Sequence, residues 1–431
     1  MTSTTTPPEA GHETSDETAP AADARRRWPR VLAGVLLVPL GVLLGPVAAA
    51  AAFLGAATVT DRLPSLYAAA LVALLLGCGL PVHAAVRRRH VTVTVTGLVA
   101  LATVLLAAAT VLRPLDVAAP RPRFEPTGYW ELPTGSRLAH HHLPAVGPPR
   151  PTPVIVLHGG PGTPGDGPSD VDRALASRGY DVYTYDQVGS GRSTRLSDPT
   201  GYTVARQVAD LEAIRVELGA DRVVLLGSSW GASLAAEYLA AHPGRVAAMV
   251  LTSPGTLWAP AWADRGEGDI WDRLTPEQER RIAELENNPR LVAWSLLTGV
   301  NPRAAHALVP DAEIDPLFAE LLDIAAPAAA CDPTRPLTVT SAALPGFYAN
   351  QLVSADQSTV PDPRPALRSS HVPTLVLRGD CDYKRPEIAA EYAEVLPEAR
   401  LVTIPDAGHV IESDQPDAYR EAILDFLTPR Q

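Results

Sequence analysis

The chain has 431 residues, of which 46% are hydrophobic, 19% are charged and 5% are aromatic, and its formal net charge is −12. This composition excludes a wholly disordered chain, a collagen and a coiled coil, because the apolar share is that of packed domains and no repeat of those classes occurs. The acidic balance also argues against nucleic acid as a partner, since no basic stripe is interleaved with aromatic side chains.

Residues 1–30 are expected to form a disordered tail. Residues 1–23 are rich in Thr, Pro, Glu, Ala and Asp and show no hydrophobic periodicity. Such a segment cannot bury enough apolar surface to offset the entropy of ordering it. Arginines then mark the end of the tail, at Arg25, Arg26, Arg27 and Arg30.

Three long uncharged segments follow within residues 31–113, and each is long enough to cross a membrane as a helix. We expect spans at about 31–57, 64–86 and 91–112, because about 20 apolar residues cross a hydrocarbon core. A cleaved signal peptide or a buried Ala-rich helical hairpin is the alternative to a three-helix anchor.

Arginine placement predicts the orientation of these spans. Arginines gather in the tail and in the second inter-helix loop, at Arg87, Arg88 and Arg89, whereas the first loop holds only Arg62. Positive charge favours the cytoplasmic side, so the amino terminus is predicted to be cytoplasmic. Three crossings then place everything after Arg113 outside the cytoplasm, in a multi-pass protein of the cell membrane.

The rest of the chain is predicted to be a linker, residues 114–127, and an α/β domain, residues 128–431. Short apolar runs bounded by glycine alternate with helical patterns, which is typical of a mostly parallel, doubly wound sheet covered on both faces. The expected strands are 154–157, 182–185, 222–226, 247–252, 374–377 and 401–404. Between about 254 and 368 the alternation stops, and we interpret this helical, proline-broken stretch as a lid inserted after a strand.

A serine at a strand-to-helix junction is the candidate nucleophile. The string Gly227-Ser-Ser-Trp-Gly231 fits G-x-S-x-G, with an apolar strand before it and an Ala-rich helix after it. This arrangement exposes the hydroxyl of Ser229 on a sharp turn. A serine hydroxyl needs a base, and that base needs an acid to fix its tautomer.

The base and the acid are expected further along the chain. His409 follows the last strand and Asp382 follows the strand before it, so both lie at the carboxyl edge of the sheet, where ligands of such sheets bind. Asp380 is the rival acid, two residues away. Catalysis also needs two backbone N–H groups for the oxyanion, and we expect them from Trp230 and from Gly160, with Gly159 as the second choice.

These segments, HGGPG at 158–162, DQVGSGRS at 186–193, GSSWGA, GDCD and DAGH, resemble the proline iminopeptidase branch of the α/β-hydrolase superfamily. The resemblance covers about residues 128–428. It implies the α/β-hydrolase fold with a helical lid, the triad Ser229, Asp382 and His409, and acidic lid side chains that bind the free amino end of a substrate. Val188 stands where that branch has arginine, Ser228 replaces a glycine, and the lid aligns with no motif.

The sequence therefore predicts a membrane-anchored serine hydrolase that cleaves an amide or ester outside the cytoplasm, most simply an aminopeptidase of small peptides. An esterase or acyltransferase on the same fold and a non-catalytic binding module are the alternatives. The expected partners are a small substrate and the lipid bilayer, with no cofactor and no metal. Whether Cys331 and Cys381 form a disulfide stays open at this point.

Overall fold

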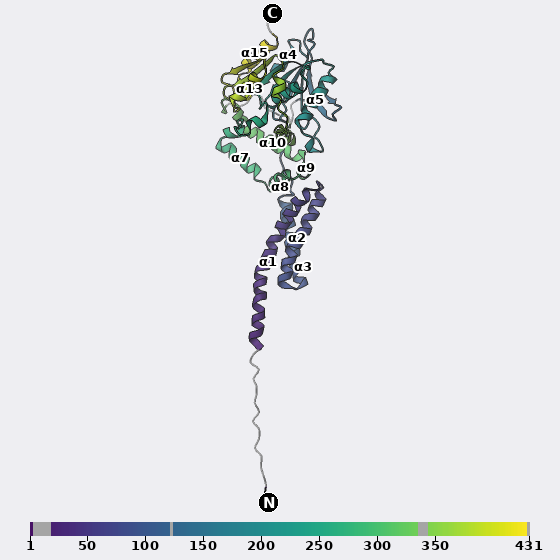
Figure 1. The fold of residues 1–431 in the computed structure, drawn as a ribbon, viewed down its shortest axis with the longest axis vertical. Coiled ribbons are helices and arrows are strands. Elements are labelled where there is room, and N and C mark those ends of the chain that lie inside the picture. Colours follow the sequence, from purple (N-terminus) through teal and green to yellow (C-terminus); the bar gives the residue numbers. More distant parts are fainter. Residues whose placement is uncertain (3–18, 121–123, 335–343, 429–431) are drawn as a thin grey trace. The chain divides into compact units, whose positions relative to one another are not determined.

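The computed structural model describes residues 1–2, 19–120, 124–334 and 344–428. The chain divides into two compact units, Met1–Leu112 and Arg113–Gln431. The described part of the first unit contains α1 (Ala19–Ala57), α2 (Leu63–Val86) and α3 (Arg89–Ala109), shown in purple and blue in Figure 1.

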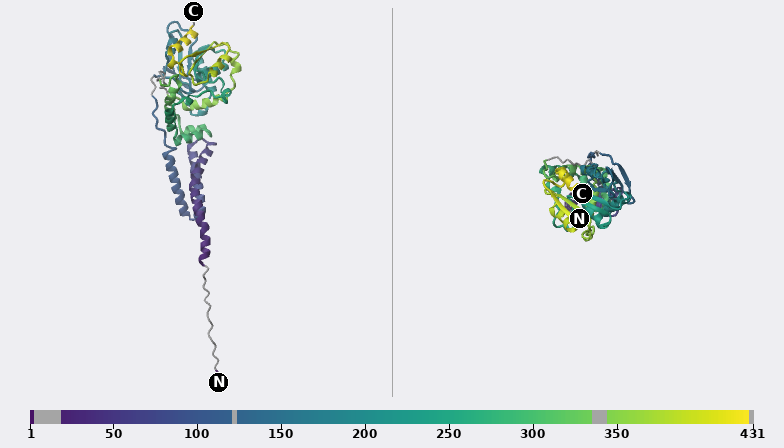
Figure 2. Two further views of the ribbon diagram at one scale, coloured as in Figure 1. Left: turned by 90° about the vertical axis from the view of Figure 1, so that its left-hand side faces the viewer. Right: turned by 90° about the horizontal axis from the view of Figure 1, so that it is seen from above.

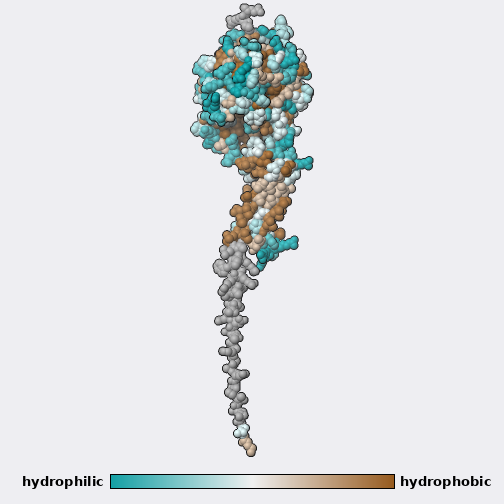
Figure 3. Space-filling view, in the orientation of Figure 1, coloured by the Kyte–Doolittle hydropathy of each residue, from teal (hydrophilic) through white to brown (hydrophobic). Residues whose placement is uncertain are grey.

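Each of these three helices contains a stretch long and apolar enough to cross a membrane, namely Gly34–Ala57, Leu63–Val86 and Arg89–Ala109. Large apolar side chains remain exposed on them, and Figure 3 shows this surface as largely brown. In water such a surface would be costly, whereas lipid tails would cover it. The finding supports membrane association of this unit.

Small residues let α1 and α2 pack closely. A Cβ placed on Gly41 would stand 2.8 Å from the carbonyl oxygen of Cys78, and one placed on Gly45 would stand 3.0 Å from the Cys78 Cβ. Cys78 itself is buried between the helices. Close backbone approach through small residues is typical of helices that pack within a bilayer.

The first helix begins earlier than we expected. We assigned residues 1–30 to a disordered tail, but α1 begins at Ala19. Alanine and arginine favour helix, so the arginine-rich stretch before the first span extends this helix instead of ending the tail. Residues 3–18, the greater part of the predicted tail, lie outside the described residues.

The described part of the second unit forms an eight-stranded sheet in the order β1-β2-β4-β3-β5-β6-β7-β8. The strands are β1 (Gly128–Glu131), β2 (Arg137–Leu143), β3 (Val154–Leu157), β4 (Val182–Tyr185), β5 (Val223–Ser228), β6 (Val246–Thr252), β7 (Thr374–Gly379) and β8 (Ala399–Ile404). From β4 to β8 neighbouring strands pair in parallel. The predicted mostly parallel, doubly wound fold is confirmed.

Strands β1 and β2 were not among the strands we predicted. They pair antiparallel with each other, and β2 pairs antiparallel with β4. The histidines of β2 interrupt the continuous apolar sequence that marks a buried strand. Instead the His140 ring stacks on Trp130 at 3.9 Å between centroids, and the His142 ring stacks on Tyr183 at 4.3 Å, so aromatic stacking covers this edge.

Helices cover both faces of the sheet, as Figures 1 and 2 show. On one face α4 (Asp170–Ala176) and α15 (Pro416–Leu427) bury Leu175 and Ile423 against β-strand residues such as Val224. Alternate strand residues point to the other face. There α5 (Val204–Glu217), α6 (Trp230–Ala241) and α13 (Pro386–Val395) form the second layer. A short helix, α14 (Ile411–Asp414), precedes α15.

A helical segment lies between β6 and β7. In its described part it contains η2 (Ala259–Trp262), η3 (Ile270–Arg273), α7 (Pro276–Glu286), α8 (Pro289–Thr298), α9 (Pro302–Leu308), α10 (Asp311–Ala325), η4 (Ala326–Ala329), α11 (Phe347–Gln357) and α12 (Arg364–Leu367). A separate 3-10 turn, η1 (Pro199–Gly201), follows β4. We call the segment between Thr252 and Thr374 the lid.

Candidate active site

Ser229 lies at the turn between β5 and α6, in an unusual backbone conformation. Its φ is 53° and its ψ is −116°, a region that non-glycine residues rarely adopt and that costs free energy. Glycines on both sides make the turn possible: a Cβ on Gly227 would collide with the Gly231 carbonyl, and a Cβ on Gly231 would collide with the Leu157 carbonyl. The G-x-S-x-G spacing thus follows from two close backbone contacts.

His409 and Asp382 lie side by side. The distance between His409 Nδ1 and Asp382 Oδ1 is 2.8 Å, and their side chains are 10% and 2% exposed. Burial alone would raise the pKa of Asp382, but the His409 charge and the hydrogen bonds that the carboxylate accepts outweigh it, so the pKa is lowered. A carboxylate on Nδ1 fixes the tautomer in which Nε2 is free to take a proton.

The rival acid lies elsewhere. Asp380 is exposed, and its backbone N–H pairs with Ile404 on β8. Asp382, two residues later, turns inward toward His409. The sequence did not decide between the two carboxylates. In the structure Asp382, and not Asp380, contacts the histidine.

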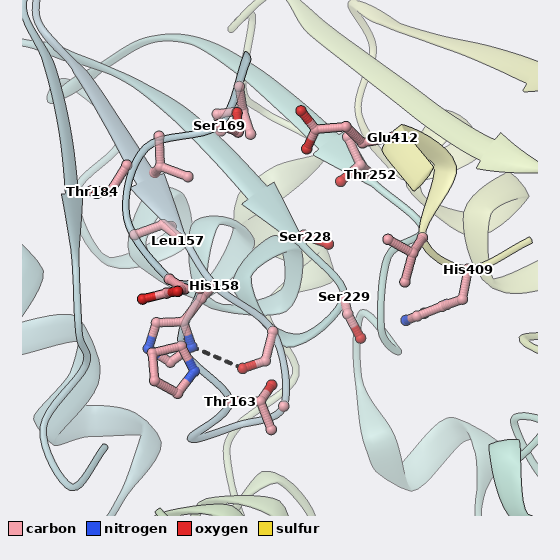
Figure 4. A pocket seen from close by; sticks show the side chains of 18 of the residues that line it. Leu157, His158, Thr163, Ser169, Thr184, Ser228, Ser229, Thr252, His409 and Glu412 are labelled. Carbon is pink, nitrogen blue, oxygen red and sulfur yellow. Dashed lines mark hydrogen bonds between the residues drawn. The ribbon is translucent and has the colours of Figure 1, made fainter. Parts of the chain in front are cut away.

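Ser229 and His409 face the same cavity. Figure 4 shows their side chains directed toward each other across it, from the β5–α6 turn and the loop after β8. In the described residues no hydrogen bond joins the two side chains, and such contacts often tighten only when substrate binds.

The expected oxyanion donors lie beside the serine. Trp230 is the first residue of α6, so its N–H is among those without an intrahelical acceptor. Gly160 and Gly159 both line the cavity with Ser229. A Cβ on Gly159 would stand only 3.2 Å from the Ser229 Cβ, which shows how closely this loop approaches the serine.

The buried side chain of Gln187, which the sequence did not reveal as a site residue, links Trp230 to the loop that begins at His158. The Trp230 indole N–H donates to Gln187 Oε1 at 2.9 Å, and Gln187 Nε2 donates to the His158 carbonyl at 3.0 Å. The Gln187 backbone N–H donates to His158 Nε2 at 2.9 Å. Gln187 is the second residue of the DQVGSGRS segment, and that motif is the sequence feature that could have pointed to its role.

The lid segment around η4 joins the loops that carry His409 and Asp382. The His409 N–H donates to the Ala329 carbonyl at 2.7 Å, and Cys331 forms a disulfide with Cys381, whose Cα lies 5.1 Å away. Asp414 Oδ2 accepts from the N–H groups of Cys331 and Gly408, at 2.9 and 2.7 Å. These contacts therefore hold the lid against the loops that carry His409 and Asp382.

The cavity in front of Ser229 measures about 860 Å³ and lies between the sheet edge and the lid. A second cavity of about 280 Å³ also reaches Ser229 and is lined by Trp230, Trp262 and Ala259. Among the described residues one cluster has metal-ligand atoms within reach of one another, Cys331, Asp380 and Cys381. The disulfide occupies both of its sulfurs, so the cluster does not fit a metal ion.

Comparison with known proteins supports the fold and the reaction class. The family described as alpha/beta hydrolase fold matches residues 152–297. A proline iminopeptidase of Levilactobacillus brevis is 30% identical over 281 residues, covering 64% of this chain and 88% of the relative. One of Xylella fastidiosa is 31% identical over 294 residues, covering 61% and 85%.

Among solved structures, an esterase from Exiguobacterium antarcticum is similar with a TM-score of 0.47 and 19% identity, covering 70% of this chain and 98% of its own. The sheet order, the glycine-framed serine turn and the relatives at about 30% identity agree with one another. The chain belongs to the α/β-hydrolase fold family, with proline iminopeptidases among its relatives, and it is a hydrolase.

Proposed function

We propose that this protein is a membrane-anchored serine hydrolase that removes the amino-terminal residue of small peptides outside the cytoplasm. The observation that carries the proposal is the 2.8 Å contact between His409 Nδ1 and Asp382 Oδ1. His409 lines the same cavity as Ser229. The relatives named proline iminopeptidases support an amide substrate. The three apolar helices support the anchor.

In the proposed mechanism Ser229 Oγ attacks the scissile carbonyl while His409 Nε2 takes its proton. The backbone N–H groups of Trp230 and Gly160 stabilise the oxyanion. His409 then passes the proton to the leaving nitrogen, the C–N bond breaks, and the acyl group stays on Ser229. Water, activated by the same histidine, releases the acyl group, and Asp382 stabilises the imidazolium in both steps.

Fluorophosphonate labelling of the full-length protein in membranes tests the triad. We expect wild type to be labelled and Ser229→Ala to lose all labelling. Asp382→Asn should lower kcat by roughly 10⁴-fold, because the imidazole would take the wrong tautomer. Asp380→Asn is the matched control, since its carboxylate is exposed and separate from His409, and should keep near wild-type activity.

Turnover then distinguishes the substrate classes. Hydrolysis of prolyl and other aminoacyl amides supports the aminopeptidase, whereas turnover of short acyl esters alone would replace it by an esterase. A folded wild-type protein that takes no label would rule out the catalytic proposal and leave the binding module.

A further inference from the structure

Ser229 stands where two cavities meet. The cavities of about 860 and 280 Å³ are both lined by Gly160, Ser229, Glu267, Ser354 and Lys384. A hydrolase that forms an acyl-enzyme needs room for an acyl group on one side of its nucleophile and for a leaving group on the other. The residues shared by the two cavities therefore line the space on both sides of Ser229.

Two of these shared residues form an ion pair. Lys384 Nζ lies 3.1 Å from Glu267 Oε1, and the lysine side chain is 15% exposed while the glutamate is 46% exposed. Among the described residues that line the smaller cavity, these two are the charged ones. Lys384 is also the single lysine of the chain.

Backbone contacts hold the residues that carry both charges close to the loop of Asp382. The Lys384 N–H donates to Asp382 Oδ1 at 3.0 Å, and the Arg385 N–H donates to the Glu267 carbonyl at 3.0 Å. Gly268, with φ of 85°, packs so closely on the Tyr383 carbonyl that a Cβ would collide with it. The pair is thus held at a set place relative to the triad.

The ion pair leaves capacity for a ligand. An ammonium group has three donors, and Glu267 takes one of them. A dipeptide is a zwitterion whose two charged ends lie roughly 7 Å apart when extended. The Lys384–Glu267 pair, closed at 3.1 Å here, would have to separate for the two charges of a dipeptide to bind between them.

Building on the proposed function, we propose that Lys384 binds the free carboxylate of the leaving residue, which makes dipeptides the preferred substrates. As the scissile C–N bond breaks and His409 protonates the leaving nitrogen, the departing amino acid keeps its carboxylate on Lys384. Glu267, released from the lysine, faces the opposite charge of the substrate. Longer peptides and neutral leaving groups lack a carboxylate at this distance from the scissile bond.

The test compares three substrates that differ only after the scissile bond: prolyl-alanine, prolyl-alanine amide and prolyl-alanyl-alanine. Wild-type full-length enzyme in detergent should favour the dipeptide in kcat/KM. Lys384→Met should lower kcat/KM for the dipeptide by roughly 10- to 100-fold, mainly through KM, the size expected for a charged hydrogen bond. Its kcat/KM for the amide should stay within about 3-fold of wild type.

Two further variants sharpen the result. Lys384→Arg should restore part of the dipeptide preference, because it restores the charge. Arg385→Met is the matched control, an exposed positive charge on the same loop, and should leave the substrate ratio unchanged.

An equal loss on all three substrates in Lys384→Met would overturn the proposal and assign Lys384 to the support of Asp382. A wild-type enzyme that hydrolyses the amide as well as the dipeptide would also overturn it, while leaving the aminopeptidase intact. If wild type hydrolyses no amide bond at all, the proposed function fails and this inference fails with it.

Discussion

Close backbone contact around Ser229 explains why small residues occupy the positions beside it. The turn from β5 to α6 brings Gly227 against the Gly231 carbonyl, and Gly231 itself against the Leu157 carbonyl at the end of β3. The serine is thereby held in a costly conformation by contacts from two strands. A sequence string of five residues thus reflects contacts with a segment some 70 positions away.

Hydrogen bonding fixes the ring state of His158. Its Nε2 accepts from the Gln187 N–H, so the proton lies on Nδ1, which donates to the Gly159 carbonyl at 2.9 Å. Burial lowers the pKa of His158 to about 4, partly opposed by the hydrogen bond to Gly159. The imidazole is neutral at pH 7, and its role in this site is to hold the glycine loop.

The lowered pKa of His158 predicts a pH-dependent stability. Between the ordinary pKa of 6.5 and the folded value of about 4, the unfolded chain binds a proton that the folded chain does not. The free energy of unfolding is therefore highest above pH 6.5 and falls as the pH is lowered to 4. We expect this histidine to contribute roughly 1–3 kcal/mol to the fall.

Chemical denaturation of the unit Arg113–Gln431 at several pH values measures this contribution. Other buried groups titrate in the same range, so the informative quantity is the difference between wild type and His158→Gln. That difference should shrink from pH 7 to pH 4. Parallel curves for the two proteins would contradict the assignment.

At the scale of elements, the lid segment around η4 is held against the loops after β7 and β8. Ala329 of η4 accepts from the His409 N–H after β8, and the Cys331 N–H donates to Asp414 of α14. Arg273 of η3 donates to the carbonyls of Cys381 and Ala330 at 3.0 and 3.3 Å. The disulfide between Cys331 and Cys381 closes a loop with a sequence separation of 50 residues. The lid segment around η4 therefore supports the loops of Asp382 and His409.

Removing the disulfide should therefore affect both stability and catalysis. We expect the double variant Cys331→Ser, Cys381→Ser to lose about 2–4 kcal/mol of unfolding free energy, as for a loop of this length. Its kcat should fall while KM changes less, because Asp382 is the next residue after Cys381. Thermal unfolding and steady-state kinetics measure the two effects.

The third cysteine supplies the control for this experiment. Cys78 lies in α2 and is a free thiol, so Cys78→Ser should leave the kinetics of the hydrolase unit unchanged. If the double variant has the unfolding free energy and kcat of wild type, hydrogen bonds alone hold the lid segment around η4.

At the scale of the whole molecule, the two units differ in where their apolar side chains lie. The apolar surface of α1, α2 and α3 suits lipid, whereas the second unit buries its apolar residues in its own core. The arginines near the predicted tail and at residues 87–89 favour a cytoplasmic amino terminus. A disulfide in the second unit is in keeping with an oxidising compartment, since such bonds persist there.

Protease added to spheroplasts tests this topology. A protein tagged at both ends should lose the carboxyl-terminal tag in intact spheroplasts, because the proposed orientation places the hydrolase unit outside. The amino-terminal tag should be cleaved only after detergent is added. Protection of the carboxyl-terminal tag would reverse the predicted orientation or change the number of crossings.

Much of the fold was predictable because its signals are local. The parallel strands carry continuous apolar runs bounded by glycine, and the spans are long and free of charge, so composition and periodicity reveal both. The antiparallel pair β1 and β2 was missed because its stability comes from ring stacking between strands, such as His140 on Trp130. No pattern within one strand records such a contact.

The sequence by itself determined the division into an apolar helical unit and an α/β unit, the parallel sheet and three candidate catalytic residues, because each depends on short-range pattern or on position after a strand. Only the tertiary structure decided which carboxylate meets His409, that Cys331 pairs with Cys381, that Gln187 accepts from the Trp230 indole, and that Lys384 lines a cavity with Ser229. These contacts join loops that are distant in sequence. Their geometry depends on how the sheet and the lid pack, and packing is a property of the folded chain as a whole.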